Sequence, residues 1–323
     1  MNGAASHTSV SGFPAPHKPK ALPSGAVVAV FAPASPASEE KMQAGLSELE
    51  RLGFSLKKRS MQVSDGYFAA AIAERCLELL RNLRDERVDG LVALRGGYGS
   101  TYLLEEQLAA SAGEPKVIIG FSDLSSLQIF LWQHQGWVTF YGPMVAAGFD
   151  AGAGAPGGYD EASLLNAVRK TDGGWTISLR GESLVRGDAQ GRVLGGAMTM
   201  VEATLGTPWE LDTRDAILVL EDRGMRPYQI DRALMHFKQA GKLDGVRGIV
   251  LGDFPECDAP AQGSPTVRDV CARILGPLGV PIVFGAPVGH TMRPMLTLPL
   301  GVQARLNAKG EGALEILEPA VIP

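Results

Sequence analysis

The chain of 323 residues contains few cysteines and no excess of positive charge. Its three cysteines, Cys76, Cys257 and Cys271, are odd in number and include no C-x-x-C pair, which excludes a disulfide framework and a zinc knuckle. The formal net charge is −5, so the sequence lacks the basic character of a nucleic-acid-binding protein. We therefore expect no structural metal and no nucleic-acid partner.

The sequence also has no apolar run of the roughly 18–20 residues needed to span a membrane. Residues 1–24 are rich in Ser, Pro, Ala and Gly, and they have no continuous apolar core of a signal peptide. These features predict a disordered leader over residues 1–24 on a cytoplasmic protein that has no membrane partner.

Motifs for phosphate-bearing cofactors are incomplete. The loop over residues 95–99 (Arg-Gly-Gly-Tyr-Gly) provides a G-x-G, but Tyr102 occupies the place of the third glycine in a dinucleotide fingerprint. No G-x-x-x-x-G-K-[ST] segment occurs. The acidic loop over residues 253–258 lacks histidine and is more typical of a solvated loop than of a metal site. We expect neither a cofactor nor a metal.

Strand-like and helix-like segments alternate along the first half of the chain. This alternation predicts an open, mainly parallel α/β domain over residues 25–150. Strands are expected at residues 26–31, 54–58, 88–94 and 117–119, and helices at 39–52, 70–84 and 101–108.

The second half has a different character. A run of small residues between Phe149 and Tyr159 predicts a flexible connection, and we place a linker at residues 151–180. Residues 181–323 are predicted to form a mixed α/β domain. Its expected elements are short strand-like pieces between residues 175 and 194, strands at 216–220, 248–251 and 282–284, a helix at 227–238, and segments 295–298 and 302–307 that close the sheet.

Ser122 lies on a predicted strand-to-helix turn. Val117–Ile119 is typical of a buried strand, Gly120 permits a sharp turn, and helical spacing resumes at Leu124. Such a turn exposes a serine hydroxyl at the end of a sheet and lets the backbone N–H of Asp123 face the same space, as a nucleophilic serine requires. Because Leu124 replaces the second glycine of a G-x-S-x-G elbow, a helix-capping role for Ser122 or Asp123 remains an alternative.

Two other strand ends carry the partners that a serine nucleophile needs. Glu221 ends the apolar run at 216–220, and His290 lies in a loop just beyond the strand predicted at 282–284. In an open parallel sheet, ligands bind at such strand ends, and serine, histidine and carboxylate together perform acyl transfer. Asp222 is the rival orienting carboxylate, and an ordinary ion pair with Arg223 is the alternative role for either.

His290 is selected by elimination. His7 and His17 lie in the predicted leader, while His134 and His236 lie on predicted helices. The loop that follows the predicted strand therefore holds the candidate general base. For the oxyanion, the glycines of the loop at 95–99 can bring backbone N–H groups close to an anion, and Gly97 is the candidate donor beside Asp123.

Several longer segments extend this pattern in a fixed order. They are Val-Ala-Val-Phe-Ala-Pro-Ala-Ser, Tyr-Phe-Ala, Leu-Arg-Gly-Gly-Tyr-Gly, Ile-Gly-Phe-Ser-Asp-Leu-Ser, Thr-Phe-Tyr-Gly-Pro-Met, Leu-Gly-Gly-Ala-Met-Thr, Leu-Glu-Asp-Arg-Gly-Met-Arg-Pro-Tyr-Gln-Ile-Asp-Arg, Phe-Gly-Ala-Pro-Val-Gly-His and Leu-Pro-Leu-Gly, between about residues 26 and 301. In these segments the chain resembles the LD-carboxypeptidase family of serine peptidases, which includes the microcin C immunity peptidases.

The resemblance implies a Ser122–Glu221–His290 triad, with an oxyanion hole formed by the N–H groups of Asp123 and Gly97. It also implies an N-terminal open α/β domain, a C-terminal mixed domain, a homodimer and no metal. The expected reaction is removal of the terminal D-alanine from a murein tetrapeptide in the cytoplasm during cell-wall recycling. A carboxypeptidase must recognise a terminal carboxylate, and Arg95 or Tyr98 is our candidate, with bracing of the loop as the alternative for Arg95.

Two departures concern specificity. Many family members have Gly-Asn where this chain has Gly196-Ala197, and an acidic residue in place of Met225. A first alternative is therefore hydrolysis of aminoacyl-nucleotide antibiotics, for which Trp175 or Trp209 would stack on the base. A second alternative is a non-catalytic protein that binds muropeptides.

Overall fold

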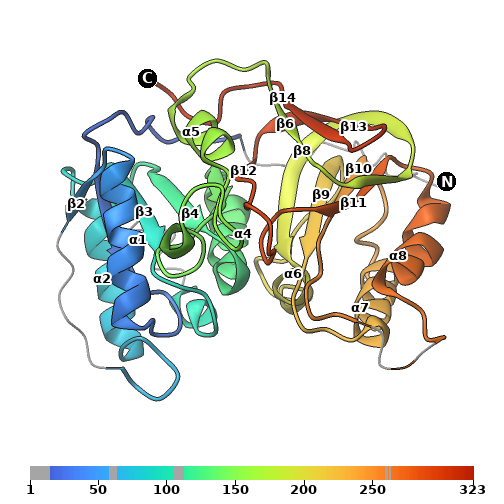
Figure 1. Cartoon of the computed structure of the whole chain (residues 1–323), viewed down its shortest axis with the longest axis horizontal. Helices are drawn as coiled ribbons and strands as arrows, with labels where there is room; N and C mark the ends of the chain where they lie inside the picture. Colours follow the sequence, from blue (N-terminus) through green and yellow to red (C-terminus); the bar gives the residue numbers. More distant parts are fainter. Residues whose placement is uncertain (1–14, 58–63, 105–112, 259–260, 262) are drawn as a thin grey trace, which may run out of the picture.

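The computed structural model describes residues 15–57, 64–104, 113–258, 261 and 263–323. These residues form two parts that lie side by side, mainly blue to green and mainly yellow to red in Figure 1, and each part is built on its own sheet. The predicted α/β class is confirmed, with a mainly parallel first sheet and a mixed second sheet.

The first sheet contains six strands among the described residues. Neighbours from β2 to β5 pair in parallel, and the sixth strand joins β5 antiparallel at the edge. In spatial order the strands are β12 (Leu298–Leu300), β5 (Thr139–Tyr141), β4 (Val117–Gly120), β3 (Gly90–Ala93), β1 (Val27–Phe31) and β2 (Ser55–Lys57).

The central strands of this sheet are apolar because they are buried along their whole length. The helices that accompany these strands bury apolar residues. They are α1 (Glu39–Arg51), α2 (Ile72–Arg84), α4 (Ser125–Gln135) and α5 (Glu161–Arg169). Helix α1 begins where the Ser38 hydroxyl accepts the N–H of Lys41, and α4 lies between the two sheets in Figure 1, in contact with elements of both.

The second sheet contains eight strands among the described residues, and a parallel centre is flanked by antiparallel strands. In spatial order they are β6 (Trp175–Ser178), β14 (Ala313–Ile316), β13 (Gln303–Ala308), β8 (Gly187–Ala197), β9 (Ala216–Glu221), β10 (Gly248–Gly252), β11 (Ile282–Ala286) and β7 (Glu182–Val185). The helices of this part are α6 (Met198–Ala203), α7 (Pro227–Gln239) and α8 (Val267–Leu275).

The segment at 295–298 was predicted to close the second sheet, and this prediction is wrong. Its end forms β12, which pairs with β5 of the first sheet from Leu298↔Tyr141 to Leu300↔Thr139. The chain therefore returns from the second part to complete the first. Sequence periodicity predicts a strand but carries no information on which sheet edge it joins.

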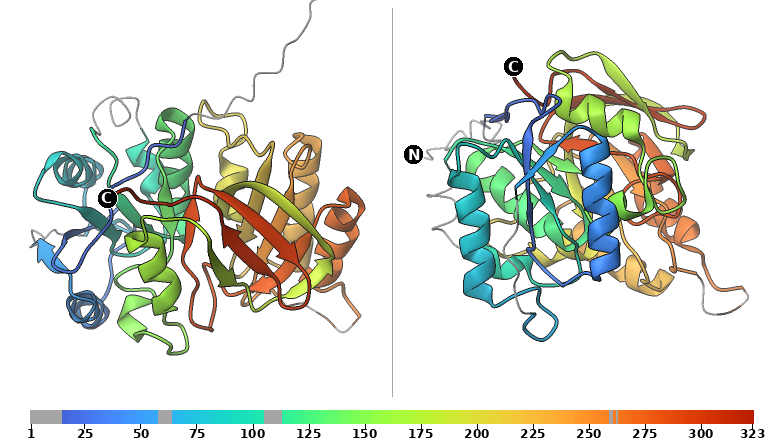
Figure 2. Two further views of the ribbon diagram at one scale, coloured as in Figure 1. Left: turned by 90° about the horizontal axis from the view of Figure 1, so that it is seen from above. Right: turned by 60° about the vertical axis from the view of Figure 1, so that its left-hand side comes forward.

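Residues 15–24 belong to the folded body, in contrast to the predicted disordered leader, whose residues 1–14 lie outside the described residues. Leu22 is buried, His17 pairs with Trp137, and Lys20 pairs with Ile322 near the C-terminus. Figure 2 shows the C-terminus lying over the first part. These backbone pairings order a segment whose composition alone indicates disorder.

In two other segments the structure differs from the sequence-based prediction. The linker at 151–180 contains α5 and β6. The helix predicted at 101–108 begins as a short 3-10 turn, η1 (Ser100–Leu103), while residues 105–108 lie outside the described residues. A run of small residues thus leads into regular structure here and does not form a long flexible connection.

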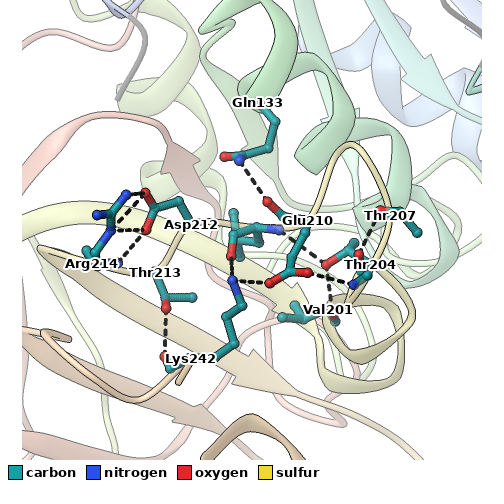
Figure 3. Close-up of polar contacts among 11 residues, drawn as sticks. Gln133, Val201, Thr204, Thr207, Glu210, Asp212, Thr213, Arg214 and Lys242 are labelled. Atoms are coloured by element: carbon teal, nitrogen blue, oxygen red, sulfur yellow. Dashed lines mark hydrogen bonds and ion pairs between the residues drawn. The ribbon is translucent and has the colours of Figure 1, made fainter. Parts of the chain in front are cut away.

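A polar network links helix α4 of the first part to the connection between α6 and β9 of the second part. The side-chain amide of Gln133 on α4 donates to the carbonyl of Glu210 at 2.8 Å. The Glu210 carboxylate forms an ion pair with Lys242, whose ammonium also donates to the carbonyl of Leu211 at 3.1 Å (Figure 3). Both carbonyls lie in the connection between α6 and β9, and the bond from Gln133 ties that connection to the first part.

Gly45 on α1 is a test of how closely the helix packs on the loop that follows β5. A Cβ atom at this position would lie 1.9 Å from the carbonyl oxygen of Val145. We expect Gly45→Ala to destabilise the protein by about 1–3 kcal/mol in urea unfolding, because overpacking outweighs the roughly 1 kcal/mol that helix propensity contributes. Ser47→Ala, exposed on the same helix, should change the stability by less than about 0.5 kcal/mol; an equal or higher stability of Gly45→Ala would contradict this packing.

Candidate active site

Ser122 lies on a strained turn at the end of β4. It begins the 3-10 turn η2 (Ser122–Leu124), and its φ of 64° is in the left-handed region that a residue with a side chain rarely adopts. Gly120 makes the turn possible, because a Cβ atom there would lie 2.4 Å from Leu124 Cδ2. The side chain of Ser122 is half-buried. The turn therefore has the strained conformation of a nucleophile elbow, although the second glycine of that motif is missing.

The glycine-rich loop after β3 lies directly against Ser122. A Cβ atom on Gly96 would lie 3.0 Å from the Ser122 hydroxyl oxygen. Gly97 has a φ of 107°, and a Cβ atom there would meet the Ser35 hydroxyl. That same hydroxyl accepts the N–H of Tyr98 at 3.2 Å. The structure thus brings the loop and the serine together, with Gly96 nearer to the hydroxyl, while the role of Gly97 as a donor stays a prediction.

Arg75, which the sequence pattern does not single out, supports this loop through hydrogen bonds to backbone carbonyls. Its guanidinium is buried and donates to the carbonyls of Gly99 at 2.9 Å and Ala70 at 3.1 Å, and to that of Pro33. Three carbonyls from three segments therefore share one cation. A basic residue inside an amphipathic helix normally indicates a solvent-facing side, which is why the pattern did not reveal it.

Asp123 is held from the same loop. Its buried carboxylate accepts the N–H of Ser100 at 2.8 Å, and its carbonyl accepts the Ser100 hydroxyl. Burial raises the pKa of Asp123, although these hydrogen bonds oppose the change. Both contacts fix the backbone after Ser122, where the candidate oxyanion donor lies.

Glu221 and His290 are in direct contact. Glu221 ends β9 and is fully buried, and its Oε2 accepts both the backbone N–H of His290 and the ring Nδ1, each at 2.9 Å. The contact leaves the Nε2 of the ring for another partner. The His290 ring also meets the ring of Phe121 edge to face, with centroids 5.0 Å apart, so it lies beside the residue that precedes Ser122.

Two glycines leave the space that the Glu221 side chain fills. A Cβ atom on Gly289 would lie 2.3 Å from Glu221 Cδ, and one on Gly252 would lie 2.4 Å from Glu221 Cβ. Gly289 also has a φ of 62°. Both positions therefore require glycine for the carboxylate to reach His290.

The carboxylate determines the proton affinity of the imidazole. Burial of the ring opposes protonation, but the facing Glu221 charge and hydrogen bond outweigh it, and the pKa of His290 is raised above its usual 6.5. A raised pKa strengthens the imidazole as a proton acceptor.

Asp222, the rival carboxylate, has a different set of partners. It accepts the backbone N–H of Thr199 and that of Arg223, each at 2.8 Å. Arg223 in turn forms an ion pair with Glu256. Of the two neighbouring carboxylates, Glu221 is therefore the one in hydrogen-bond contact with the imidazole.

The remaining candidates lie at different depths. Arg95 is exposed and donates to the carbonyl of Pro36 at 2.9 Å, which is the bracing contact considered as its alternative. Tyr98 is 45% exposed and belongs to an aromatic cluster with Phe68. Trp175 is buried in β6, and Trp209 packs edge to face on Phe130.

Two further observations concern the described part of the chain. None of its helices is both long and apolar enough to cross a bilayer. Within the same residues, no group of three or more His, Cys, Asp or Glu side chains is arranged to hold a metal ion.

Comparison with known proteins gives a consistent result. Residues 28–142 match the model of the LD-carboxypeptidase N-terminal domain, and residues 190–306 match that of the C-terminal domain. The chain is 33% identical over 302 residues to a probable murein peptide carboxypeptidase of Bacillus subtilis, covering 92% of this chain and 94% of that protein. It is 27% identical over 304 residues to the microcin C7 self-immunity protein of Escherichia coli, covering 85% and 88%.

Solved structures show the same fold. The muramoyltetrapeptide carboxypeptidase from Oxalobacter formigenes superposes with a TM-score of 0.80 at 27% identity, covering 92% of this chain and 100% of that one. A complex of the microcin self-immunity protein with glutamyl sulfamoyl guanosine superposes with a TM-score of 0.83 at 23% identity, covering 94% and 99%. From these matches along nearly its whole length, the chain belongs to the LD-carboxypeptidase family and is a serine-type carboxypeptidase.

Proposed function

We propose that this carboxypeptidase removes the terminal D-alanine from murein tetrapeptide through a Ser122–Glu221–His290 triad. The observation that carries the proposal is the contact of His290 Nδ1 with the buried Glu221 carboxylate, next to Phe121 and the strained Ser122 turn. The names of the Bacillus and Oxalobacter relatives support the substrate class. Of the two tryptophans considered for stacking on a base, Trp175 is buried in β6, and Trp209 packs on Phe130.

In the proposed reaction, the Ser122 hydroxyl attacks the carbonyl of the amide that links a diamino acid to D-alanine. His290 Nε2 accepts the hydroxyl proton, and Glu221 holds the tautomer and stabilises the imidazolium. The tetrahedral oxyanion is stabilised by the N–H groups of Asp123 and Gly97. Collapse breaks the C–N bond as His290 protonates the leaving amine, and water then releases the acyl group by the same route in reverse.

The proposal includes a cytoplasmic role in cell-wall recycling and a homodimeric enzyme. Both rest on the family resemblance. The substrate is then a small soluble muropeptide.

Ser122→Ala should abolish D-alanine release, because loss of a triad nucleophile lowers kcat by roughly 10⁴–10⁶. Mass spectrometry of the products from murein tripeptide, tetrapeptide and pentapeptide, and from an aminoacyl sulfamoyl adenosine, measures this loss and the substrate class together. Retention of a tenth of the wild-type rate would reject Ser122 as nucleophile. A wild-type protein that binds tetrapeptide without cleaving it would favour the non-catalytic alternative.

Glu221→Gln and Asp222→Asn form a matched pair, because each replaces one of two adjacent buried carboxylates by its amide. We expect Glu221→Gln to lower kcat by roughly 10³–10⁴, since an amide does not stabilise the imidazolium. Asp222→Asn should lower kcat by less than about tenfold, because Asp222 accepts backbone N–H groups and does not contact the ring. The reverse order would transfer the orienting role to Asp222.

Amidation of the substrate's terminal carboxylate tests the recognition that a carboxypeptidase requires. Arg95 has N–H donors beyond the one bound to Pro36, so we expect the amide to lower kcat/KM by at least about tenfold. Arg95→Gln should remove this discrimination. Arg87→Gln, in which an exposed arginine that pairs with Asp85 is changed, should retain it; equal wild-type efficiency on acid and amide would exclude carboxylate recognition.

A further inference from the structure

Tyr141 connects the two halves of the candidate site through one oxygen atom. It is the last residue of β5, where it pairs in register with Gly120, and its side chain is fully buried. The phenol donates to Glu221 Oε1 at 2.5 Å and accepts the backbone N–H of Ser122 at 3.4 Å. The nucleophile turn and the triad carboxylate come from different sheets, so this oxygen contacts both.

The Glu221 carboxylate needs this donor. Its Oε2 is bonded by the backbone N–H and by the ring of His290, each at 2.9 Å, while Oε1 lies 3.3 Å from the ring nitrogen. The phenol is therefore the close donor for Oε1. A buried carboxylate oxygen that loses its hydrogen-bond donor is left without solvation, which raises the free energy of the charged form. The carboxylate then attracts the nearest remaining proton, that of the His290 ring, more strongly.

We propose that Tyr141 is a positioning residue that fixes the Glu221 carboxylate and limits how strongly it attracts the proton of His290. This inference rests on the proposed function, because it gives Tyr141 a role in the same reaction. It does not require Tyr141 to touch the substrate.

The surroundings keep the phenol as a donor. Burial, together with the Glu221 charge and hydrogen bond, raises the pKa of Tyr141 well above its usual value, so the hydroxyl stays protonated over the working range. The other charged groups that act on His290 are Asp222 and Arg223, which follow Glu221, and Glu256. None of these changes when the phenol oxygen is removed.

The test compares Tyr141→Phe with Tyr159→Phe. Tyr159 is a matched control, because it is equally buried and its phenol also donates to a glutamate, Glu48, at 2.7 Å. His290 accepts a proton only when it is neutral, so activity falls as the pH drops through the pKa of His290. Because a carboxylate without the phenol attracts the imidazole proton more strongly, that pKa rises further in Tyr141→Phe.

We expect Tyr141→Phe to lower kcat about tenfold with little change in KM, and to move the acidic limb of kcat/KM upward by at least about half a pH unit. The imidazole of His290, identified among the five histidines by comparison with His290→Gln, should show the same upward shift in an NMR titration. Tyr159→Phe should change neither. A loss of activity without any shift in the limb or the titration would overturn the inference, and so would equal shifts in both variants.

Two further readouts keep the test decisive. If Tyr141→Phe does not fold, 3-fluorotyrosine at position 141 provides a more acidic phenol of almost the same shape and should shift the His290 titration downward; no shift would overturn the inference. The titration does not depend on turnover. A wild-type protein that releases no D-alanine, combined with a shifted titration in Tyr141→Phe, would reject the proposed function and support the role of Tyr141.

Discussion

The burial of the Glu221 carboxylate is the constraint on which the candidate site depends. A charged group without solvent is costly unless its oxygens are hydrogen-bonded. Here the donors are the backbone and ring of His290 and the phenol of Tyr141. Each donor must approach within hydrogen-bond distance, so the carboxylate determines where the His290 loop and the end of β5 lie. Gly252 and Gly289 are required for the same reason, since a side chain at either position would overlap Glu221.

The site is divided between two sheets, and its geometry therefore depends on how they are joined. Ser122 follows β4 of the first sheet, while Glu221 ends β9 of the second. Several independent contacts fix the junction. Strand β12 returns to the first sheet, Gln133 on α4 bonds the connection between α6 and β9, and Tyr141 reaches Glu221. Rigid support of this kind helps to hold the candidate nucleophile and its candidate base at a fixed separation.

The sequence predicted the triad candidates because their residue types are unusual where they stand. A serine after Val-Ile-Ile-Gly, a glutamate at the end of an apolar run and a histidine in a loop each depart from the local pattern, and the departures mark strand ends. The structure brings Glu221 and His290 into contact and places His290 beside Phe121.

Tyr141 and Arg75 were missed for the opposite reason. A tyrosine at the end of an apolar strand and an arginine in an amphipathic helix fit their local patterns, so nothing in the sequence indicates that one contacts a carboxylate and the other three carbonyls. The sheet joined by β12 and the ordered path of residues 15–24 depend on pairings between distant segments. Periodicity describes a segment and not its partner, so such pairings lie beyond it.

The small residues at the end of β8 complete the junction. A Cβ atom on Gly196 would lie 2.5 Å from the Ser125 hydroxyl oxygen and 3.3 Å from a ring carbon of Tyr141. The next residue, Ala197, donates its backbone N–H to that same hydroxyl at 3.1 Å. A side chain at 196 would thus push the two sheets apart at the point where Tyr141 passes between them to Glu221. The glycine is therefore required by the packing around Tyr141, whereas its neighbour Ala197 adds only a methyl group to this end of the strand.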